Sequence, residues 1–336
     1  MARESGGATT LADVAREAGV SVITVSRVIR NAGPISDKTR DKVMKAVRKT
    51  GYRPNPIAVS LVSRASNLIA VIIPSLSNIV YADVLRGINE TVTKGGFRTT
   101  FGLTEYDMGE ELRLVESLLA WRPAALFLAG VEHLPETEAL IRQSNVRCIE
   151  FMELRDDPLD VVIGFSHEEA GRQSARYLLS RGYERIGYVG HDLKRDLRAA
   201  RRYRAFRETV EEAGYRLIDE RVVDTQSSVE AGRASTADIL AEPGRIDAIY
   251  FSNDDMAIGG YFHCLAAGIG MPDDLAIMGF NGLDIGQQMP QRLTTILTRR
   301  LDIGRHAGEA ALALNSDRTV APIQNIGFDL IAGETT

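Results

Sequence analysis

Two spacings of apolar residues divide this chain into a short head and a long body. Within residues 9–53, apolar side chains recur at intervals of three and four, which is typical of amphipathic helices. From Leu68 onward, continuous apolar runs alternate with amphipathic stretches of about 10–16 residues. The apolar runs are LIAVIIPS, RTTFGL, AALFLAG, RCIEFM, VVIGFS, RIGYVG, AIYFSN, LAIMGF and TTIL. Because such runs form strands buried on both faces, the body predicts parallel sheets covered by helices.

The first helix of the head has a clear beginning and end. Thr10 can cap a helix over residues 11–18, with Asp13 three residues on as its capping-box partner. Gly19 then suits a tight turn that needs positive φ. This pattern predicts a short helix followed by a sharp change of direction.

A second helix follows, in which Ser21 caps residues 22–30. Val25 and Ile29 lie four residues apart and are expected to face inward. The outer face would then carry Val22, Ile23, Ser26, Arg27 and Arg30. An alternative is that Val22 and Ile23 pack against the core of the head itself. The two helices and their turn predict a helix-turn-helix whose second helix enters a DNA groove.

Charge separates the head from the body. Residues 1–66 hold 12 Lys and Arg against 5 Asp and Glu, whereas the whole chain carries a net charge of −5. Many of these cations lie on a third helix, which Ser36 caps. A basic head on an acidic body is expected when only the head meets phosphate. The alternative is a helical bundle with a solvated basic surface.

Residues 54–67, PNPIAVSLVSRASN, separate the head from the body. Asn55 can cap a short helix and Pro56 suits its first position. Ala58 and Leu61 would share one apolar face of that helix. A helix this short is marginal alone, so we expect it to fold only when DNA and a second copy pack against it. An ordinary linker with a few apolar residues is the alternative.

Polar side chains directly follow four of the predicted strands. Ser75, Glu153, Asn253 and Asn281 occupy these positions. Ligands of open α/β sheets bind beyond the carboxyl ends of the strands, and each hydroxyl of a polyol needs a donor and an acceptor. The four side chains therefore predict a polyol pocket. Asp254 is also at a strand end, but we interpret it as a helix cap and leave it out of the binding set.

Several classes of function find no support in the sequence. It has no signal peptide and no 18-residue apolar run, so we expect a soluble cytoplasmic protein rather than a periplasmic solute-binding protein. Cys148 and Cys264 lie in apolar surroundings and predict buried reduced thiols. The five histidines show no metal-binding spacing, and no catalytic signature or cofactor-binding motif is present. We therefore expect neither an enzyme nor a metal or cofactor site.

The run LADVAREAGVSVITVSRVIRN, followed by SDKTRDKV and GYRPN, resembles the head of the LacI/GalR family of bacterial transcription regulators. The resemblance continues through SNLIAVIIPSLSN, FSNDDMAIG and MPDDLAIMGFNGLDIG, and it covers essentially the whole chain from residue 9. Within the family, SNDDMAIG and GFNGLDIGQQMPQRLTTILTRR are most similar to the gluconate-operon repressors.

The resemblance assigns roles in DNA binding. It implies that Val22, Ile23 and Arg27 read bases, with Arg27 bonding to guanine O6 and N7. Thr24, Ser26 and Arg30 would position the helix on phosphate. It also implies that Leu61 wedges into the minor groove and kinks the DNA. The complete predicted DNA-binding set is Thr10, Ser21, Val22, Ile23, Thr24, Ser26, Arg27, Arg30, Asn55, Ala58 and Leu61.

The resemblance also implies a domain plan. A helix-turn-helix head at 9–54 is joined by a hinge helix and linker at 55–66 to an effector-binding and dimerisation domain at 67–336. This domain would be a two-lobed α/β body like a type I periplasmic binding protein. Lobe one would span about 67–164 plus 295–324, and lobe two about 165–294 plus 325–336. A homodimer on a pseudo-palindromic operator at the nucleoid is the family expectation.

The predicted effector set combines the strand ends with two further residues. By resemblance, Glu153, Arg202, Asn253 and Asn281 occupy sugar-contacting positions, although Ala205 replaces the glycine that usually follows the arginine. Many relatives have Asp where Asn281 stands, so this cleft carries one negative charge fewer. The complete predicted effector-binding set is Ser75, Glu153, Arg202, Ser227, Asn253 and Asn281.

These residues lead to an effector hypothesis. Arg202 would pair with a carboxylate, and polar Ser227 and Ser228 suit an open-chain ligand. We therefore expect an aldonate such as gluconate, with Glu153 on distal hydroxyls. Effector binding would reorient the lobes, weaken hinge pairing and release DNA. A neutral sugar and a corepressor of opposite sign remain open alternatives.

Overall fold

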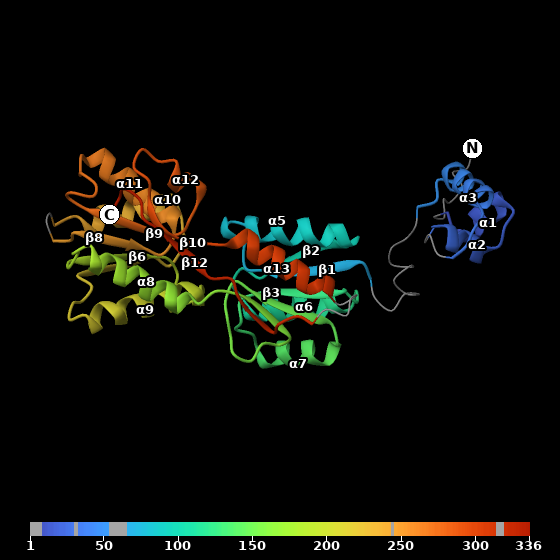
Figure 1. The fold of residues 1–336 in the computed structure, drawn as a ribbon, viewed down its shortest axis with the longest axis horizontal. Helices are drawn as coiled ribbons and strands as arrows, with labels where there is room; N and C mark the ends of the chain where they lie inside the picture. The colour runs from blue at the N-terminus through green and yellow to red at the C-terminus, as the bar shows by residue number, and fades with distance from the viewer. Residues whose placement is uncertain (1–8, 30–32, 54–65, 243–244, 314–318) are drawn as a thin grey trace, which may run out of the picture. The chain divides into compact units, whose positions relative to one another are not determined.

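The computed structural model describes residues 9–29, 33–53, 66–242, 245–313 and 319–336 (Figure 1). The chain divides into two compact units, residues 1–66 and residues 67–336. The predicted residues Arg30, Asn55, Ala58 and Leu61 lie outside the described ranges. The first unit is the helical head, and the second unit contains the two α/β lobes.

Three helices form the head, as the sequence predicts: α1 (Leu11–Ala18), α2 (Val22–Ile29) and α3 (Asp37–Thr50). The capping box of α1 is present, because the Thr10 amide donates to Asp13 Oδ2 at 2.9 Å and the Asp13 amide donates to Thr10 Oγ1. Gly19 ends α1 with φ 58°. The buried core comprises Val14, Ala15, Ala18, Val25, Val28, Val43 and Ala46. Side chains from all three helices therefore hold α1 and α2 at their turn.

A six-stranded parallel sheet forms the first lobe, with strand order β11-β5-β4-β3-β1-β2. Its strands are β1 (Leu68–Ile73), β2 (Arg98–Leu103), β3 (Ala125–Ala129), β4 (Arg147–Phe151), β5 (Val161–Gly164) and β11 (Ile323–Asn325). Its helices are α5 (Val80–Val92), α6 (Met108–Leu119), α7 (Pro135–Ser144) and α13 (Arg300–Leu312), and η1 (Thr93–Gly95) is a 3-10 turn.

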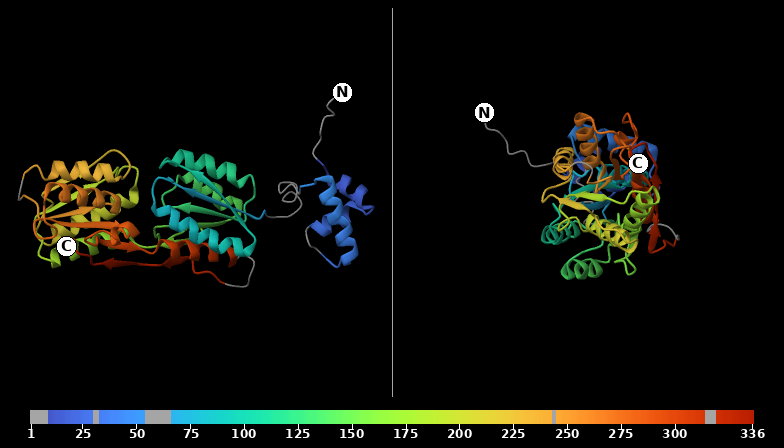
Figure 2. Two further views of the ribbon diagram at one scale, coloured as in Figure 1. Left: turned by 90° about the horizontal axis from the view of Figure 1, so that it is seen from above. Right: turned by 90° about the vertical axis from the view of Figure 1, so that its left-hand side faces the viewer.

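Both faces of this sheet are covered by helices. Along β1, Val71 belongs to the cluster that includes α5 and α13, whereas Ile72 belongs to the cluster that includes α6 and α7. Successive side chains of a strand point to opposite faces, so a run of apolar residues serves two cores. Figures 1 and 2 show α13 running beside α5 on one face.

The second lobe repeats this plan with strand order β12-β10-β9-β8-β6-β7, in which β12 alone among these strands pairs antiparallel. Its strands are β6 (Ile186–Gly190), β7 (Asp219–Val222), β8 (Ala248–Phe251), β9 (Ala276–Asn281), β10 (Thr294–Thr298) and β12 (Phe328–Ile331). Its helices are α8 (His167–Ser180), α9 (Leu197–Glu212), α10 (Val229–Ile239), α11 (Asp254–Ala267) and α12 (Asp284–Gln287).

The chain passes between the lobes at three places: from β5 to α8, from β10 to α13 and from β11 to β12. The sequence placed the second passage at residue 295, and this boundary is wrong. Residues 294–298 form β10, which pairs with β9 and β12 of the second sheet, so the passage comes after Thr298. Apolar runs alone cannot say which of two sheets a strand joins.

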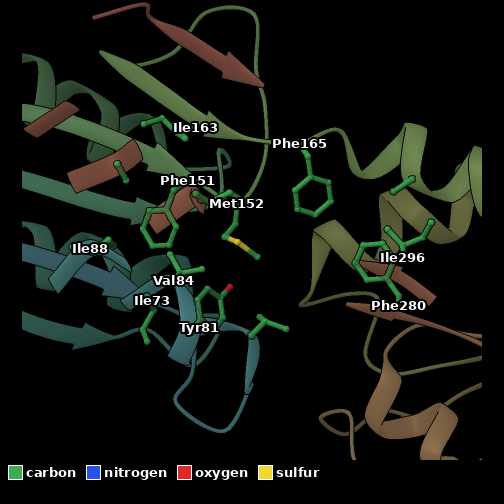
Figure 3. Packing of buried hydrophobic residues seen from close by; sticks show 14 of the residues in the cluster. Ile73, Tyr81, Val84, Ile88, Phe151, Met152, Ile163, Phe165, Phe280 and Ile296 are labelled. Atoms are coloured by element: carbon green, nitrogen blue, oxygen red, sulfur yellow. The ribbon is translucent and has the colours of Figure 1, made fainter. Parts of the chain in front are cut away.

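Apolar side chains from both lobes lie at the junction between them (Figure 3). Phe165 directly follows β5, and its ring centroid lies 6.3 Å from that of Phe280 and 5.9 Å from that of Phe328. Met152 and Tyr81 approach the same junction from the first lobe. This packing sets how the strand ends of the two lobes face each other.

Candidate functional site

The outer face of α2 is available for contact. Val22 is 44% exposed and Ile23 is 66% exposed, while Val25 and Val28 are buried. The alternative that Val22 and Ile23 pack into the core of the head is therefore wrong. Val28 is an inward residue that the sequence analysis missed, because Ile29 shares its apolar character and only the three-dimensional packing distinguishes them.

Arg27 is exposed on this face and makes no ion pair with another residue of the described ranges. Ser21 and Thr24 are engaged in the helix cap, since the Thr24 amide donates to Ser21 Oγ at 3.1 Å and the two hydroxyls lie 2.9 Å apart. Ser26 is half-buried. Two apolar side chains and one guanidinium thus form the accessible surface of the helix, and such a surface can contact thymine methyls and guanine.

The third helix of the head carries several exposed cations. Lys38, Lys42, Lys45 and Arg48 of α3 are exposed, and Lys49 pairs with Glu17 of α1 at 2.7 Å. Lysine and arginine at the periphery of a reading helix neutralise phosphates and carry no sequence information.

In the body, three predicted effector residues form one hydrogen-bonded cluster in the second lobe. Arg202 Nη2 donates to the Ser252 carbonyl at 3.1 Å and to Asn253 Oδ1 at 3.4 Å. Asn281 Nδ2 donates to the same Asn253 oxygen at 3.1 Å. The Arg202 guanidinium also lies 3.9 Å above the centre of the Phe280 ring. This arrangement holds the two strand-end amides in fixed orientations.

The other terminal nitrogen of Arg202 is bonded to His167. Its Nη1 lies 2.8 Å from His167 Nδ1, and His167 Nε2 lies 2.9 Å from the Met152 carbonyl. Burial, and then the charge of Arg202, lower the pKa of His167 well below its usual range, so the neutral ring accepts from Arg202 and donates to Met152. Both terminal nitrogens of Arg202 are thus used within the protein.

Asn281 is held in an unusual backbone conformation with φ 112°. Its carbonyl accepts from the hydroxyl of Thr298 at 3.2 Å and from Arg300, which also pairs with Asp83 of the first lobe at 3.1 Å. Residues at positive φ persist where surrounding contacts determine them, and they cluster at ligand sites. Asn281 therefore links the strand-end cluster to the passage between lobes.

Glu153 occupies the first-lobe side of the cleft. Its Oε1 accepts from the Leu154 amide at 3.0 Å, and its Oε2 accepts from Arg201 Nη1 at 2.9 Å. Arg201 also contacts Glu132, and it reaches both carboxylates from α9 of the second lobe. Ser75 is buried, and its hydroxyl accepts from the amide of Ser77, which fixes a local turn.

A cavity of about 120 Å³ lies between the lobes. Its lining combines Ser77, Asn78 and Tyr106 of the first lobe with His191, Asp192, Arg195, Asp196, Asp224, Thr225, Gln226, Ser227 and Asp255 of the second. A second cavity of about 70 Å³ shares Tyr106, Arg195 and Asp196 with the first and is lined in addition by Arg198 and Glu132. The two cavities thus adjoin along three residues and open between both lobes.

Of the six predicted effector residues, Ser227 lines the larger cavity, and its hydroxyl donates to the Asp255 carboxylate. The other five, Ser75, Glu153, Arg202, Asn253 and Asn281, are buried and line neither cavity. The sequence analysis missed His191, Asp196 and Arg198. His191 directly follows β6, so the search for polar side chains at the carboxyl ends of strands could have found it.

The interpretation of Asp254 as a helix cap is corrected. Asp254 does not cap α11; it is the first residue of that helix, and its carboxylate accepts from the Leu283 amide at 2.6 Å and from the Thr295 hydroxyl at 2.7 Å. It thereby ties α11 to the segment after β9 and to β10. The Asp255 carboxylate accepts from the Met256 amide. Neither bond could be read from sequence spacing.

Within the described residues, no group of three or more His, Cys, Asp and Glu side chains could hold a metal ion. No helix among them is long and apolar enough to span a membrane. Cys148 and Cys264 are both buried and unpaired thiols.

A head with an exposed reading helix, followed by two α/β lobes around a polar cavity, defines a DNA-binding protein with a ligand-binding body. Residues 10–55 match the profile of bacterial regulatory proteins of the lacI family, and residues 175–336 match that of a periplasmic binding protein-like domain. The HTH-type transcriptional regulator GntR of Pseudomonas aeruginosa is 35% identical, covering 98% of this chain and 96% of that protein. The chain belongs to the LacI family of transcriptional regulators.

Solved structures agree with this assignment. A LacI family transcriptional regulator from Silicibacter pomeroyi has 36% identity and a TM-score of 0.92, covering 97% of this chain and 99% of that one. The lac repressor dimer bound to operator and the anti-inducer ONPF has 26% identity and a TM-score of 0.84, covering 98% and 99%. The predicted family and fold class are confirmed.

Proposed function

We propose that the protein is a repressor that binds a pseudo-palindromic operator as a homodimer and leaves it when a sugar acid, gluconate first, enters the cleft. The exposed face of Val22, Ile23 and Arg27 supports the operator-reading role. One such helix reads one half-site, so two copies are needed for a pseudo-palindrome. On this proposal the protein acts by binding, without catalysis, at the nucleoid in the cytoplasm.

The observation that carries the effector-controlled mechanism is the shared lining of the cavity. Tyr106 and Asn78 come from one lobe, and Asp192 and Ser227 from the other. A ligand that contacts both lobes favours one relative orientation of them, and it can shift the DNA-binding equilibrium only through this difference in affinity. Release would follow when the hinge around Leu61, which lies outside the described residues, loses its pairing.

The choice of a sugar acid rests on two features. The sequence resembles the gluconate-operon repressors within the family, and two regulators named GntR are 35% identical to it. Neutral Asn281 also replaces the aspartate of many relatives, and a carboxylate there would repel an anion by roughly 4 kcal/mol at 4 Å and an effective dielectric of 20. The neutral side chain at position 281 thus supports an anionic polyol.

A neutral sugar is the second candidate. Asp192, Asp196, Asp224 and Asp255 all line the larger cavity. Carboxylates accept hydrogen bonds from hydroxyls and disfavour a nearby anion. This lining supports glucose-like ligands, and a ligand of either kind could act as a corepressor with the opposite sign.

DNA binding in the presence and absence of ligand tests the proposal. DNA selected by the purified protein from a random pool would be labelled, and its binding followed by fluorescence anisotropy at fixed salt. We expect gluconate to raise the Kd by about 5–150-fold, the usual range of allosteric coupling, and glucose to leave it unchanged. A tighter complex with gluconate would establish a corepressor. If only glucose changed the Kd for DNA, the effector would be a neutral sugar and the proposal of a sugar acid would be wrong.

A further inference from the structure

Two buried polar side chains, Arg198 and Tyr81, face each other across the lobes. Arg198 of α9 is 8% exposed and Tyr81 of α5 is 1% exposed. The Arg198 guanidinium carbon lies 5.5 Å from the centre of the Tyr81 ring. Among the residues that the structure describes, neither Arg198 Nη1 nor the Tyr81 hydroxyl has a hydrogen-bond partner. Figure 3 shows the Tyr81 hydroxyl on the side of the first-lobe core that faces the second lobe.

Unpaired buried donors are unfavourable, and most buried polar groups in native proteins have a partner. Burial also raises the pKa of Tyr81, so its hydroxyl keeps its proton and can donate. Arg198 lines the smaller cavity. Arg198 thus presents a guanidinium to the smaller cavity, and the Tyr81 phenol lies next to that guanidinium. One carboxylate has two acceptor oxygens and can accept from both donors.

Asp196 pairs with only one of the nitrogens of the Arg198 guanidinium. Its Oδ1 lies 3.6 Å from Arg198 Nε, and its carboxylate also accepts from the Ala199 amide and approaches His191 at 3.2 Å. Burial alone would raise the pKa of Asp196, but the charge of Arg198 and the hydrogen bond to His191 lower it well below its usual range. The Asp196 carboxylate thus stays ionised and lies next to Arg198 Nε. Arg198 Nη1 is left without an acceptor among the described residues.

Arg202 differs from Arg198 in its terminal nitrogens, and only its Nε has no hydrogen-bond partner among the described residues. Both its terminal nitrogens are bonded to protein groups, namely His167 Nδ1, the Ser252 carbonyl and Asn253 Oδ1. A ligand carboxylate would have to displace these bonds before it could form a bidentate pair with Arg202. The existing contacts suit a residue that orients Asn253 and Asn281.

The two cavities differ in the side chains that are free to meet a ligand. Asp224, Asp255 and Ser227 line the larger cavity. The smaller cavity is lined by Arg198 and also by Asp107, Glu111 and Glu132, of which Glu111 is paired with His133 and Glu132 with Arg201. Carboxylates and hydroxyls of the larger cavity accept from ligand hydroxyls, while the Arg198 guanidinium attracts an anion. A ligand with a carboxylate at one end and hydroxyls along its chain matches this polarity.

We propose that Arg198 and Tyr81 form the carboxylate subsite of the cleft and that Arg202 is a positioning residue. A sugar acid bound in this way bridges the two lobes, with its hydroxyl chain directed toward Ser227 and Asp255. The inference rests on the proposed function, because it takes a sugar acid as the effector.

Titration calorimetry with gluconate and glucitol tests the subsite. The two ligands share one carbon chain and differ in a carboxylate against a hydroxymethyl group, so their affinity ratio isolates the carboxylate contact. For the full-length wild-type protein we expect gluconate to bind about 10–100-fold more tightly, the range for hydrogen bonds to charged groups. Arg198→Gln is expected to reduce this ratio to about threefold or less.

Tyr81→Phe provides a second variant that does not remove a charge. It deletes a hydroxyl that lacks a partner in the absence of ligand, so the thermal midpoint should stay unchanged or rise. Gluconate affinity should nevertheless fall about 3–10-fold while glucitol affinity is kept. If Arg198→Gln fails to fold, as judged by circular dichroism, Tyr81→Phe decides the question by itself.

Two further variants complete the design. Arg204→Gln removes an exposed charge from the same helix, where Arg204 pairs with Glu168, and should keep the wild-type ratio. Arg202→Gln should weaken gluconate and glucitol alike. A ratio that survives in folded Arg198→Gln and Tyr81→Phe, or that is lost only in Arg202→Gln, overturns the subsite and leaves the proposed function standing. Failure of the wild-type protein to bind gluconate overturns both.

Discussion

Arg201 of the second lobe lies 2.9 Å from Glu153 of the first, measured from Nη1 to Oε2. Arg201 also contacts Glu132, so one guanidinium joins two carboxylates of the other lobe. Glu153 is buried, whereas Arg201 is partly exposed. The pair therefore fastens the two lobes beside the cavities, in the orientation that this structure presents.

Loss of this pair should loosen the body. Arg201→Ala leaves Glu153 buried without its cation, and we expect it to lower the free energy of unfolding by about 1–3 kcal/mol. Chemical denaturation followed by circular dichroism measures the change. Arg204→Ala changes another arginine of α9 and breaks its exposed pair with Glu168 of α8, so it should change stability by only about 0–1 kcal/mol. Equal effects of the two variants would contradict a special role for Arg201.

Sequence specificity should depend on Arg27. Arg27→Ala is expected to lose about 1–3 kcal/mol of binding free energy at one base pair of each half-site and to relax the preference there. Competition between the selected operator and its single-base variants measures this loss. An unchanged preference would mean that another element reads the DNA.

Phosphate contacts should behave differently. Lys45→Ala removes an exposed cation of α3, so binding should weaken by a similar factor for every DNA sequence. The slope of log K against log salt should decrease by about 1 per lost contact. Anisotropy titrations at several salt concentrations provide both readouts, and a sequence-dependent effect of Lys45→Ala would argue against a phosphate contact.

His133 should make stability depend on pH. Its buried ring nitrogens lie 2.7 Å from Glu111 and 3.5 Å from Glu150. Burial lowers the pKa of His133, but the two carboxylates outweigh burial and raise it to about 9. The protonated ring therefore contributes stability that is complete below its unfolded pKa of about 6.5 and is lost as pH rises toward 9.

Thermal midpoints between pH 6 and pH 9.5 test this. We expect His133→Gln to be destabilised by about 2–3 kcal/mol at pH 6, with the difference from wild type shrinking as the pH rises. His306→Gln, at an exposed position, is the matched control and should follow the wild-type curve. A His133→Gln difference that stays constant with pH would show that the ring is neutral in the folded protein.

The close packing of α8 against α9 should affect the position of Arg202 and, through it, of Asn253 and Asn281. A Cβ atom built on Gly171 of α8 would lie 2.3 Å from the carbonyl oxygen of Arg202 on α9. Gly171→Ala must push the helices apart, so we expect a loss of about 1–3 kcal/mol in stability together with weaker ligand binding. Gly109→Ala on α6, where the nearest atom lies on a side chain, should be tolerated. If folded Gly171→Ala kept the wild-type ligand affinity, the position of Arg202 would not influence ligand binding.

Much of the fold follows from local pattern. All nine apolar runs form strands, and the caps at Thr10, Ser21 and Ser36 begin the helices of the head. The strands β7, β11 and β12 were not predicted. They are short and lie at sheet edges or beside them, where side chains are partly exposed and the apolar signal is weak.

The site was harder to predict, because it depends on partners that are distant in sequence. Arg198, Arg201, Arg202 and Arg204 form one run of similar residues, and the pattern gives no reason to separate them. Packing separates them: Arg198 meets Tyr81, Arg201 meets Glu153, and Arg204 remains at the surface. Only the assembled lobes determine which guanidinium has an unpaired terminal nitrogen, and here, among the described residues, it is that of Arg198.

The three passages of the chain between the lobes have a consequence for biosynthesis. The first sheet receives β11, and its covering helix α13, only after almost the whole second lobe has been made. The head, by contrast, is a contiguous unit of residues 1–66 and emerges first from the ribosome. Because domains generally fold as units from the N-terminus, a nascent chain would acquire its DNA-reading helix well before it acquires a finished pocket that can respond to ligand.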